Sequence, residues 1–193
     1  TPEEIHKVNK IQNSLKIEAN NYTKKLNLPK YNLESYEYIK KLIKQLFETS
    51  PKMTSKGMFG TKEEVNDLKH LMGVYFGWGG LKEQYVLYDS RFVKDNNGKT
   101  EYQLNFGKVP IDAFWSIIVY NNNGFIYKNK KNSLNNFTTI PNKDGTYTIN
   151  FSNDNKKINN LNIGHGWNYT IRMYEPRKEI LNGSWKFPKE ITV

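Results

Sequence analysis

Cysteine is absent from the 193-residue sequence, which excludes disulfides, zinc–thiolate sites and a cysteine nucleophile. No apolar run approaches the roughly 20 residues that a membrane helix requires, so we expect a soluble chain without a transmembrane segment. Histidine is scarce and scattered at His6, His70 and His165, without the spacing of metal ligands. We therefore expect no metal site and no cofactor.

Arginine is also rare, because Arg91, Arg172 and Arg177 are the only arginines among 29 basic residues in a chain of formal net charge +10. Lysine lacks the planar fork that suits bidentate recognition of phosphate or guanine. The lysines are also spread along the chain in isolated pairs. The composition favours a solvated lysine-rich surface, so we expect no nucleic-acid partner.

Helical periodicity dominates the first part of the chain, where apolar residues recur at steps of three and four. This pattern predicts three helices, one over residues 1 to 27, one from residue 32 or 33 to 49, and one that opens with a capping box at Thr61–Glu64 and ends at Gly77. We expect residues 1–72 to pack on the rest of the chain. The first helix carries an apolar stripe through which the chain could form a homo-oligomer.

Strand-like alternation replaces the helical period over residues 73–193, which we predict to form one globular unit with the helices. YVLYDSRFV and TEYQLNFG flank the turn Asp95–Gly98 and predict a hairpin. IDAFWSIIVY, GFIY, GTYTINFS and WNYTIRMY predict further strands. The fold class is therefore α+β, an antiparallel β-sandwich, jelly-roll-like, preceded by about three N-terminal helices.

The remaining segments read as connections. The asparagine-rich stretches 129–136 and 153–162 are typical of mobile loops. We expect the tail after Glu175 to be irregular chain anchored by Trp185.

The Phe114-Trp115-Ser116 segment could line an active site or form the middle of a sheet. In a strand over residues 112–120, both alternating faces are mostly apolar. We therefore expect a central strand that is covered on both sides. Ser116 lacks the glycine-flanked elbow of a serine nucleophile, so we interpret it as a structural serine.

Two polar residues in and beside the last predicted strand could carry chemistry. His165 lies between two glycines, where a loop can bring a general base to the edge of a sheet. Arg172 lies within the strand and, if buried, needs either a carboxylate such as Asp89, Asp112 or Glu175, or a bound anion. Both alternatives remain open.

Three functions fit these residues. The first is binding of a small polar, anionic or aromatic ligand, a carbohydrate included, at the rim of the sandwich. A hydrolase or lyase that uses His165 and Arg172 is the alternative, and a structural or interaction module is the third. The predicted ligand-binding residues are Trp78, Tyr88, Trp115, Tyr120, His165, Trp167, Arg172 and Tyr174.

Four stretches in a fixed order carry a family resemblance: GWGGLKEQYVLY, YQLNFGKVPIDAFWSIIVYNNNGFI, DGTYTINF and GWNYTIRMYEPRKEILNGSWKFP. Residues 73–193 resemble domain of unknown function family 1214, which is often paired with family 1254. The resemblance implies a jelly-roll-like β-sandwich of periplasmic or secreted location, with no settled activity.

Overall fold

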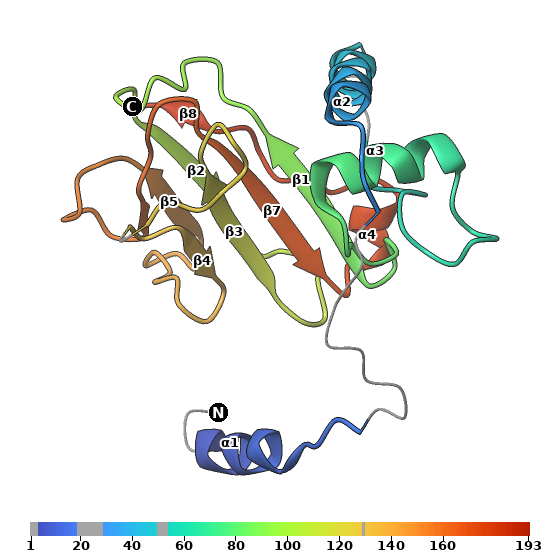
Figure 1. Cartoon of the computed structure of the whole chain (residues 1–193). Helices are drawn as coiled ribbons and strands as arrows, with labels where there is room; N and C mark the ends of the chain where they lie inside the picture. The colour runs from blue at the N-terminus through green and yellow to red at the C-terminus, as the bar shows by residue number, and fades with distance from the viewer. Residues whose placement is uncertain (1–3, 19–28, 50–53, 129) are drawn as a thin grey trace. The chain divides into compact units, whose positions relative to one another are not determined.

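The structure is a computed structural model that describes residues 4–18, 29–49, 54–128 and 130–193. These residues form two compact units, residues 1–38 and residues 39–193, each described by itself. The helices and strands, labelled in Figure 1, are α1 (Ile5–Ser14), α2 (Leu33–Glu48), α3 (Asp67–Gly77), β1 (Val86–Arg91), β2 (Tyr102–Phe106), β3 (Trp115–Tyr120), β4 (Ser133–Asn135), β5 (Tyr147–Phe151), β6 (Asn160–Leu161), β7 (Asn168–Tyr174), α4 (Lys178–Leu181) and β8 (Ile191–Thr192).

Two four-stranded sheets share one core, which confirms an α+β fold with two largely antiparallel sheets. The first sheet has the order β1-β7-β3-β4, and the second has the order β6-β5-β2-β8. Every strand pair is antiparallel except β5 with β6. Side chains from both sheets, among them Ile117, Ile171, Leu104 and Phe151, form a single buried cluster. The jelly-roll topology stays a prediction.

The Phe-Trp segment is a strand in the interior of the first sheet, since β3 pairs with β7 on one side and β4 on the other. Trp115, Ile117 and Val119 are buried in the common core. Ile118 and Tyr120 on the opposite side are only half-buried. The expectation of cover on both sides therefore fails for the second face, which points away from the core.

The predicted hairpin of β1 and β2 is wrong. β1 pairs with β7 in the first sheet, and β2 pairs with β5 in the second, so the Asp95–Gly98 turn carries the chain from one sheet to the other. Gly98 has φ +75°, and a Cβ there would lie 2.6 Å from the carbonyl carbon of Gly164. The turn thus packs backbone to backbone against the loop before β7, which is an approach that only glycine allows.

The helices differ from their predicted bounds at three points. Residues 15–18 are not helical, because α1 ends at Ser14, whose Oγ donates to the Ile11 carbonyl 2.7 Å away and competes with the helix. Residues 1–3 and 19–28 lie outside the described part. α3 begins at Asp67 rather than beside Thr61, because Asn66 caps it by accepting from the Lys69 N–H at 3.1 Å. The short helix α4 lies in the tail that we predicted to be irregular.

α1 buries none of its residues, and Ile5, Val8, Ile11 and Leu15 are exposed. Self-association through this helix stays a prediction. None of the helices in the described ranges is long and apolar enough to cross a membrane.

Both predicted mobile loops contain a strand, and the second also contains the buried asparagines Asn159, Asn160 and Asn162. β4 lies in the stretch 129–136 and β6 in the stretch 153–162, whereas GFIY forms no strand. Asn159 accepts a hydrogen bond from the Ile140 N–H at 2.9 Å and donates to the carbonyls of Ile140 at 2.8 Å and Thr148 at 3.1 Å. Its backbone is left-handed, with φ 50°. The asparagine therefore ties the connection at Ile140 to strand β5 at Thr148.

We expect Asn159→Gly to lower the free energy of unfolding by about 2 kcal/mol, because buried backbone groups lose their partners while the left-handed backbone stays accessible. Asn159→Ala should cost about 1 kcal/mol more, since alanine disfavours that backbone. Urea denaturation measures both. Asn105→Ala, at an exposed position of β2, should change the value by less than about 0.5 kcal/mol. A similarly small effect at Asn159 would contradict the cross-linking role.

Candidate functional site

The predicted site residues fall into three groups. Tyr88, Tyr120, Arg172 and Tyr174 lie on the face of the first sheet that points away from the core, because they alternate with the buried residues of β1, β3 and β7. We call this surface the Arg172 face. Trp115 and Trp167 are buried in the core, with 2% and 0% of their surface exposed. Trp78 and His165 are exposed outside the sheets.

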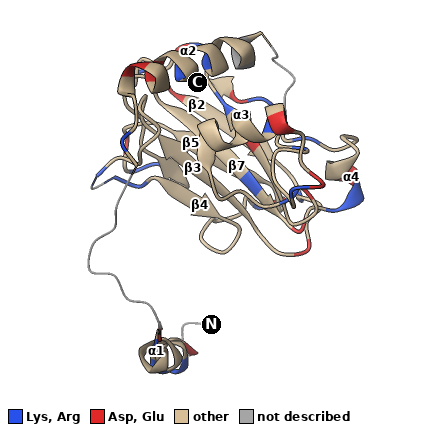
Figure 2. Cartoon of the chain, turned by 45° about the vertical axis from the view of Figure 1, so that its right-hand side comes forward, with Lys and Arg blue, Asp and Glu red and all other residues tan. Residues whose placement is uncertain are grey.

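Arg172 is the only basic residue on β7 and lies in the middle of the Arg172 face (Figure 2). In the strand register it is flanked by Tyr88 of β1 and Ser116 of β3. Its Nη2 donates to the Tyr120 hydroxyl at 2.7 Å. The guanidinium carbon lies 5.9 Å from the ring centre of Tyr88 and 5.8 Å from that of Tyr120. The phenol rings of Tyr88 and Tyr120 therefore both make cation–π contacts with the guanidinium group.

The guanidinium has no carboxylate partner among the described residues. Asp89 pairs with Arg91 at 2.6 Å and Asp112 pairs with Arg177 at 2.6 Å. Glu175, the third predicted partner, forms no ion pair with Arg172 in these ranges. Asp89 and Asp112 are thus engaged by other arginines, and none of the three predicted carboxylates pairs with Arg172 in the described part of the chain. Nη1 of Arg172 is buried and has no hydrogen-bond partner there, which leaves a cationic donor available to an anion.

Hydroxyl groups and rings surround this cation. Ser116 and Thr170 are 8% and 9% exposed, and the Thr170 hydroxyl lies 3.0 Å from that of Ser90 on the neighbouring strand. Tyr174 stacks on Phe114 with ring centres 4.1 Å apart and an interplanar angle of 12°. The surface can thus offer a charged donor, hydroxyls and aromatic carbon to one small ligand.

The sequence predicted Thr170 and Tyr174 on the same strand face as Arg172, but it did not single out Phe114 or Ser90 as neighbours. Two-residue alternation along β7 was a usable signal for Thr170 and Tyr174, because it places both on the side of Arg172. Ser90 could not be found in this way, since its position beside Thr170 depends on the pairing of β1 with β7.

His165 and Arg172 do not form a pair. His165 is exposed in the loop before β7, and no hydrogen bond or ring contact joins the two residues in the described structure. Along β7 the backbone from Asn168 to Arg172 alone extends about 13 Å. The geometry therefore gives the hydrolase or lyase hypothesis no assembled base and cation. No group of three or more histidine and acidic residues suited to a metal ion occurs in the part of the chain that the structure describes.

Arg91 provides the contrast to Arg172. Its side chain points toward the C-terminal segment, where Nη2 donates to Asp89 at 2.6 Å and to the Phe187 carbonyl at 3.0 Å. Tyr169 donates to Glu190 at 2.6 Å beside it. Burial alone lowers the pKa of Arg91, but the hydrogen bond and charge of Asp89 outweigh burial and raise it. Burial raises the pKa of Tyr169 well above its usual value.

This arrangement of Arg91, Asp89, Tyr169 and Glu190 is a C-terminal clamp. Arg91 holds residues 187–190 through the Phe187 carbonyl and Glu190. The positive charge of Arg91 is balanced by the carboxylates of Asp89 and Glu190. A paired arginine has a structural role, whereas the incompletely paired Arg172 remains available for binding.

The structure thus defines an α+β protein with two largely antiparallel four-stranded sheets, one of which carries Arg172 between two tyrosines. Residues 87–178 match the family model described as "Protein of unknown function (DUF1214)". This match lies within residues 73–193 and confirms the resemblance of this part of the chain to that family. The pairing with family 1254 stays a prediction. No curated protein matches the chain.

The fold is also found in solved structures. The chain is similar to the VPA0106 protein from Vibrio parahaemolyticus, with a TM-score of 0.59 and 23% identity over 86% of this chain and 47% of that chain. It is also similar to an uncharacterised protein from Burkholderia cenocepacia, with a TM-score of 0.46 and 17% identity over 60% of this chain and 31% of that chain. The chain spans about half the length of the first protein, and this likeness supports the fold alone.

The two arginines should respond oppositely to the same substitution. We expect Arg91→Met to lower the free energy of unfolding by about 3 kcal/mol, because Asp89 loses its charged partner. Arg172→Met should leave the value within about 0.5 kcal/mol or raise it, since it removes a desolvated cation that lacks a counter-charge. Urea denaturation of the two variants measures the difference. Equal losses would show that Arg172 is structural.

Proposed function

We propose that the Arg172 face binds a small ligand that carries a carboxylate, with sugar acids and aromatic acids as the candidate classes. The observation that carries this proposal is the buried Nη1 of Arg172, which has no partner among the described residues. A ligand oxygen that accepts from Nη1 would satisfy this donor and balance the charge. Guanidinium–carboxylate hydrogen bonds are among the strongest in proteins because both partners are charged.

The neighbouring groups support a carboxylate on a ring-bearing ligand. The bond from Nη2 to Tyr120 orients the guanidinium, so a ligand meets a fixed fork rather than a mobile side chain. Tyr88 and Tyr120 are half-buried beside it and offer aromatic carbon to an apolar ring or to the face of a sugar. Ser116 and Thr170 beside Arg172 are nearly buried, so a ligand that reaches Nη1 must displace the groups that cover it, which suits a small ligand held by a few directed contacts.

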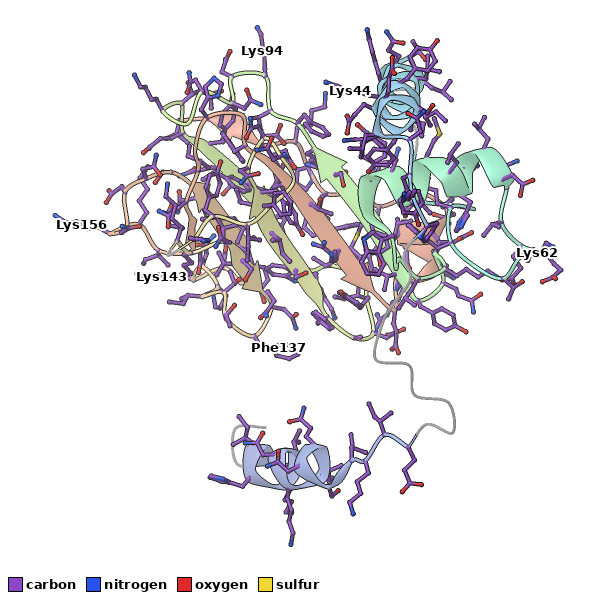
Figure 3. The ribbon with its side chains drawn as sticks, in the orientation of Figure 1. Lys44, Lys62, Lys94, Phe137, Lys143 and Lys156 are labelled. Atoms are coloured by element: carbon purple, nitrogen blue, oxygen red, sulfur yellow. The ribbon has the colours of Figure 1, made fainter. Side chains whose placement is uncertain are left out.

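The family resemblance supports two further elements of the proposal. We propose a jelly-roll arrangement of the strands and a periplasmic or secreted location, in which small acids would reach the Arg172 face directly. Lys94, Lys143 and Lys156 extend from the sandwich into solvent (Figure 3), so we assign the charge selectivity to Arg172.

We expect glucuronate and benzoate to raise the melting temperature and to bind in calorimetric titrations, whereas glucose and benzamide, which lack the charge, should not. Arg172→Met should weaken binding by about 10- to 100-fold, the worth of a hydrogen bond to a charged group. Arg172→Lys should restore only part of the affinity, because lysine lacks the fork.

Arg177→Met is the matched control, since Arg177 is an exposed arginine paired with Asp112 and should bind as the parent protein does. The proposal would be overturned by neutral analogues that bind equally well, by unchanged affinity in Arg172→Met, or by no carboxylate-dependent response.

A further inference from the structure

A pocket of about 420 Å³ lies at the rim of the sandwich, where β3 begins. It is separate from the Arg172 face because it opens on the core side of β3. Trp115 lines it, whereas the next residue, Ser116, points to the other side of the sheet and lies beside Arg172. We call it the rim pocket. Its lining residues are Lys108, Val109, Ile111, Ala113, Trp115, Asn136, Gly145 and Tyr147.

The floor of the rim pocket is apolar and firmly packed. Val109 and Trp115 are 7% and 2% exposed. Trp115 contacts Phe106 and Tyr147 edge to face, with ring centres 5.2 Å and 5.7 Å apart. These contacts occupy much of the ring surface, so the floor does not offer an open aromatic face for stacking on a sugar. It offers ring edges and aliphatic carbon to an apolar group.

Lys108 and Asn136 supply hydrogen-bond donors to the lining, beside the Tyr147 hydroxyl, which can donate or accept. Asn136 Oδ1 accepts from the Trp115 N–H at 3.2 Å, which leaves the Asn136 amide NH₂ without a partner among the described residues. Lys108 is exposed and forms no ion pair or hydrogen bond within those ranges. An ammonium and an amide NH₂ beside an apolar floor complement a ligand with an apolar body and an anionic head.

We propose that the rim pocket is a second ligand site, which takes a small apolar carboxylic acid. The apolar body lies against Val109, Ile111 and Trp115, and the carboxylate accepts from Lys108 and Asn136. The volume is within the range of about 300 to 1,000 Å³ typical of small-molecule sites. This proposal is independent of the one for the Arg172 face, because the two sites share no side chain.

Calorimetric titration with indole-3-acetate tests the rim pocket, with indole-3-acetamide as the uncharged control. We expect saturable binding of the acid and at least about tenfold weaker binding of the amide, since the amide lacks the charge that Lys108 recognises. Lys108→Met should weaken the acid by about tenfold. Ala113→Leu, at an exposed position of the lining, should remove binding by filling the pocket while the protein stays folded.

Two controls separate the sites. Lys94→Met removes an exposed lysine outside the pocket and should bind indole-3-acetate as the parent protein does. Because the Arg172 face also accepts aromatic acids, the Lys108 and Ala113 variants are compared in the Arg172→Met background, in which saturable binding of indole-3-acetate should remain. If Arg172→Met abolished the binding of indole-3-acetate, the acid would bind at the Arg172 face. The proposal for the Arg172 face would then stand, and the proposal for the rim pocket would be overturned. Equal affinity for acid and amide, unchanged affinity in Ala113→Leu, or no binding of the acid would also overturn it.

Discussion

The two-residue alternation of β7 is the constraint on which the rest of the molecule depends. β7 is paired along its length with β1 on one side and β3 on the other, so neither edge of it is free. Tyr169 and Ile171 point into the core, where Tyr169 packs against Phe151 with ring centres 4.7 Å apart. Thr170 and Arg172 point away. One strand thus supplies both the aromatic packing that joins the sheets and the cation of the candidate site.

The existence of most long strands could be predicted from the sequence, because their alternation is a local property. Their partners could not. β1 and β2 are neighbours in sequence and joined by a good turn signal, yet each gains more by pairing with a distant strand that completes its half of the core. Burial over the whole fold outweighs the preference of a single turn. Tertiary contacts also order the asparagine-rich stretches. The Asn159 amide, for example, donates to the carbonyl of Ile140, which is 19 residues away in the sequence.

The candidate site was predictable in part. Arg172, Tyr88, Tyr120 and Tyr174 were identified by residue type and come together. Trp115 and Trp167 were also identified by residue type, but they are buried. A large aromatic ring can fill a hydrophobic core as well as line a ligand site, and the sequence does not distinguish the two. Asp89 and Arg91 are two residues apart on β1, so alternation alone places them on one side of the strand. The neighbours of Arg172 depend instead on which strands pair with β7, and that follows from tertiary packing.

The asparagine contacts around Ile140 and Thr148 have a consequence for the lifetime of the protein. In a chain without cysteine, these amide hydrogen bonds cross-link segments that no disulfide can join. Asparagine side chains can, however, deamidate slowly. Deamidation of Asn159 would replace an NH₂ donor by a carboxylate that faces two carbonyl oxygens, and the resulting repulsion would open the connection that the amide had closed.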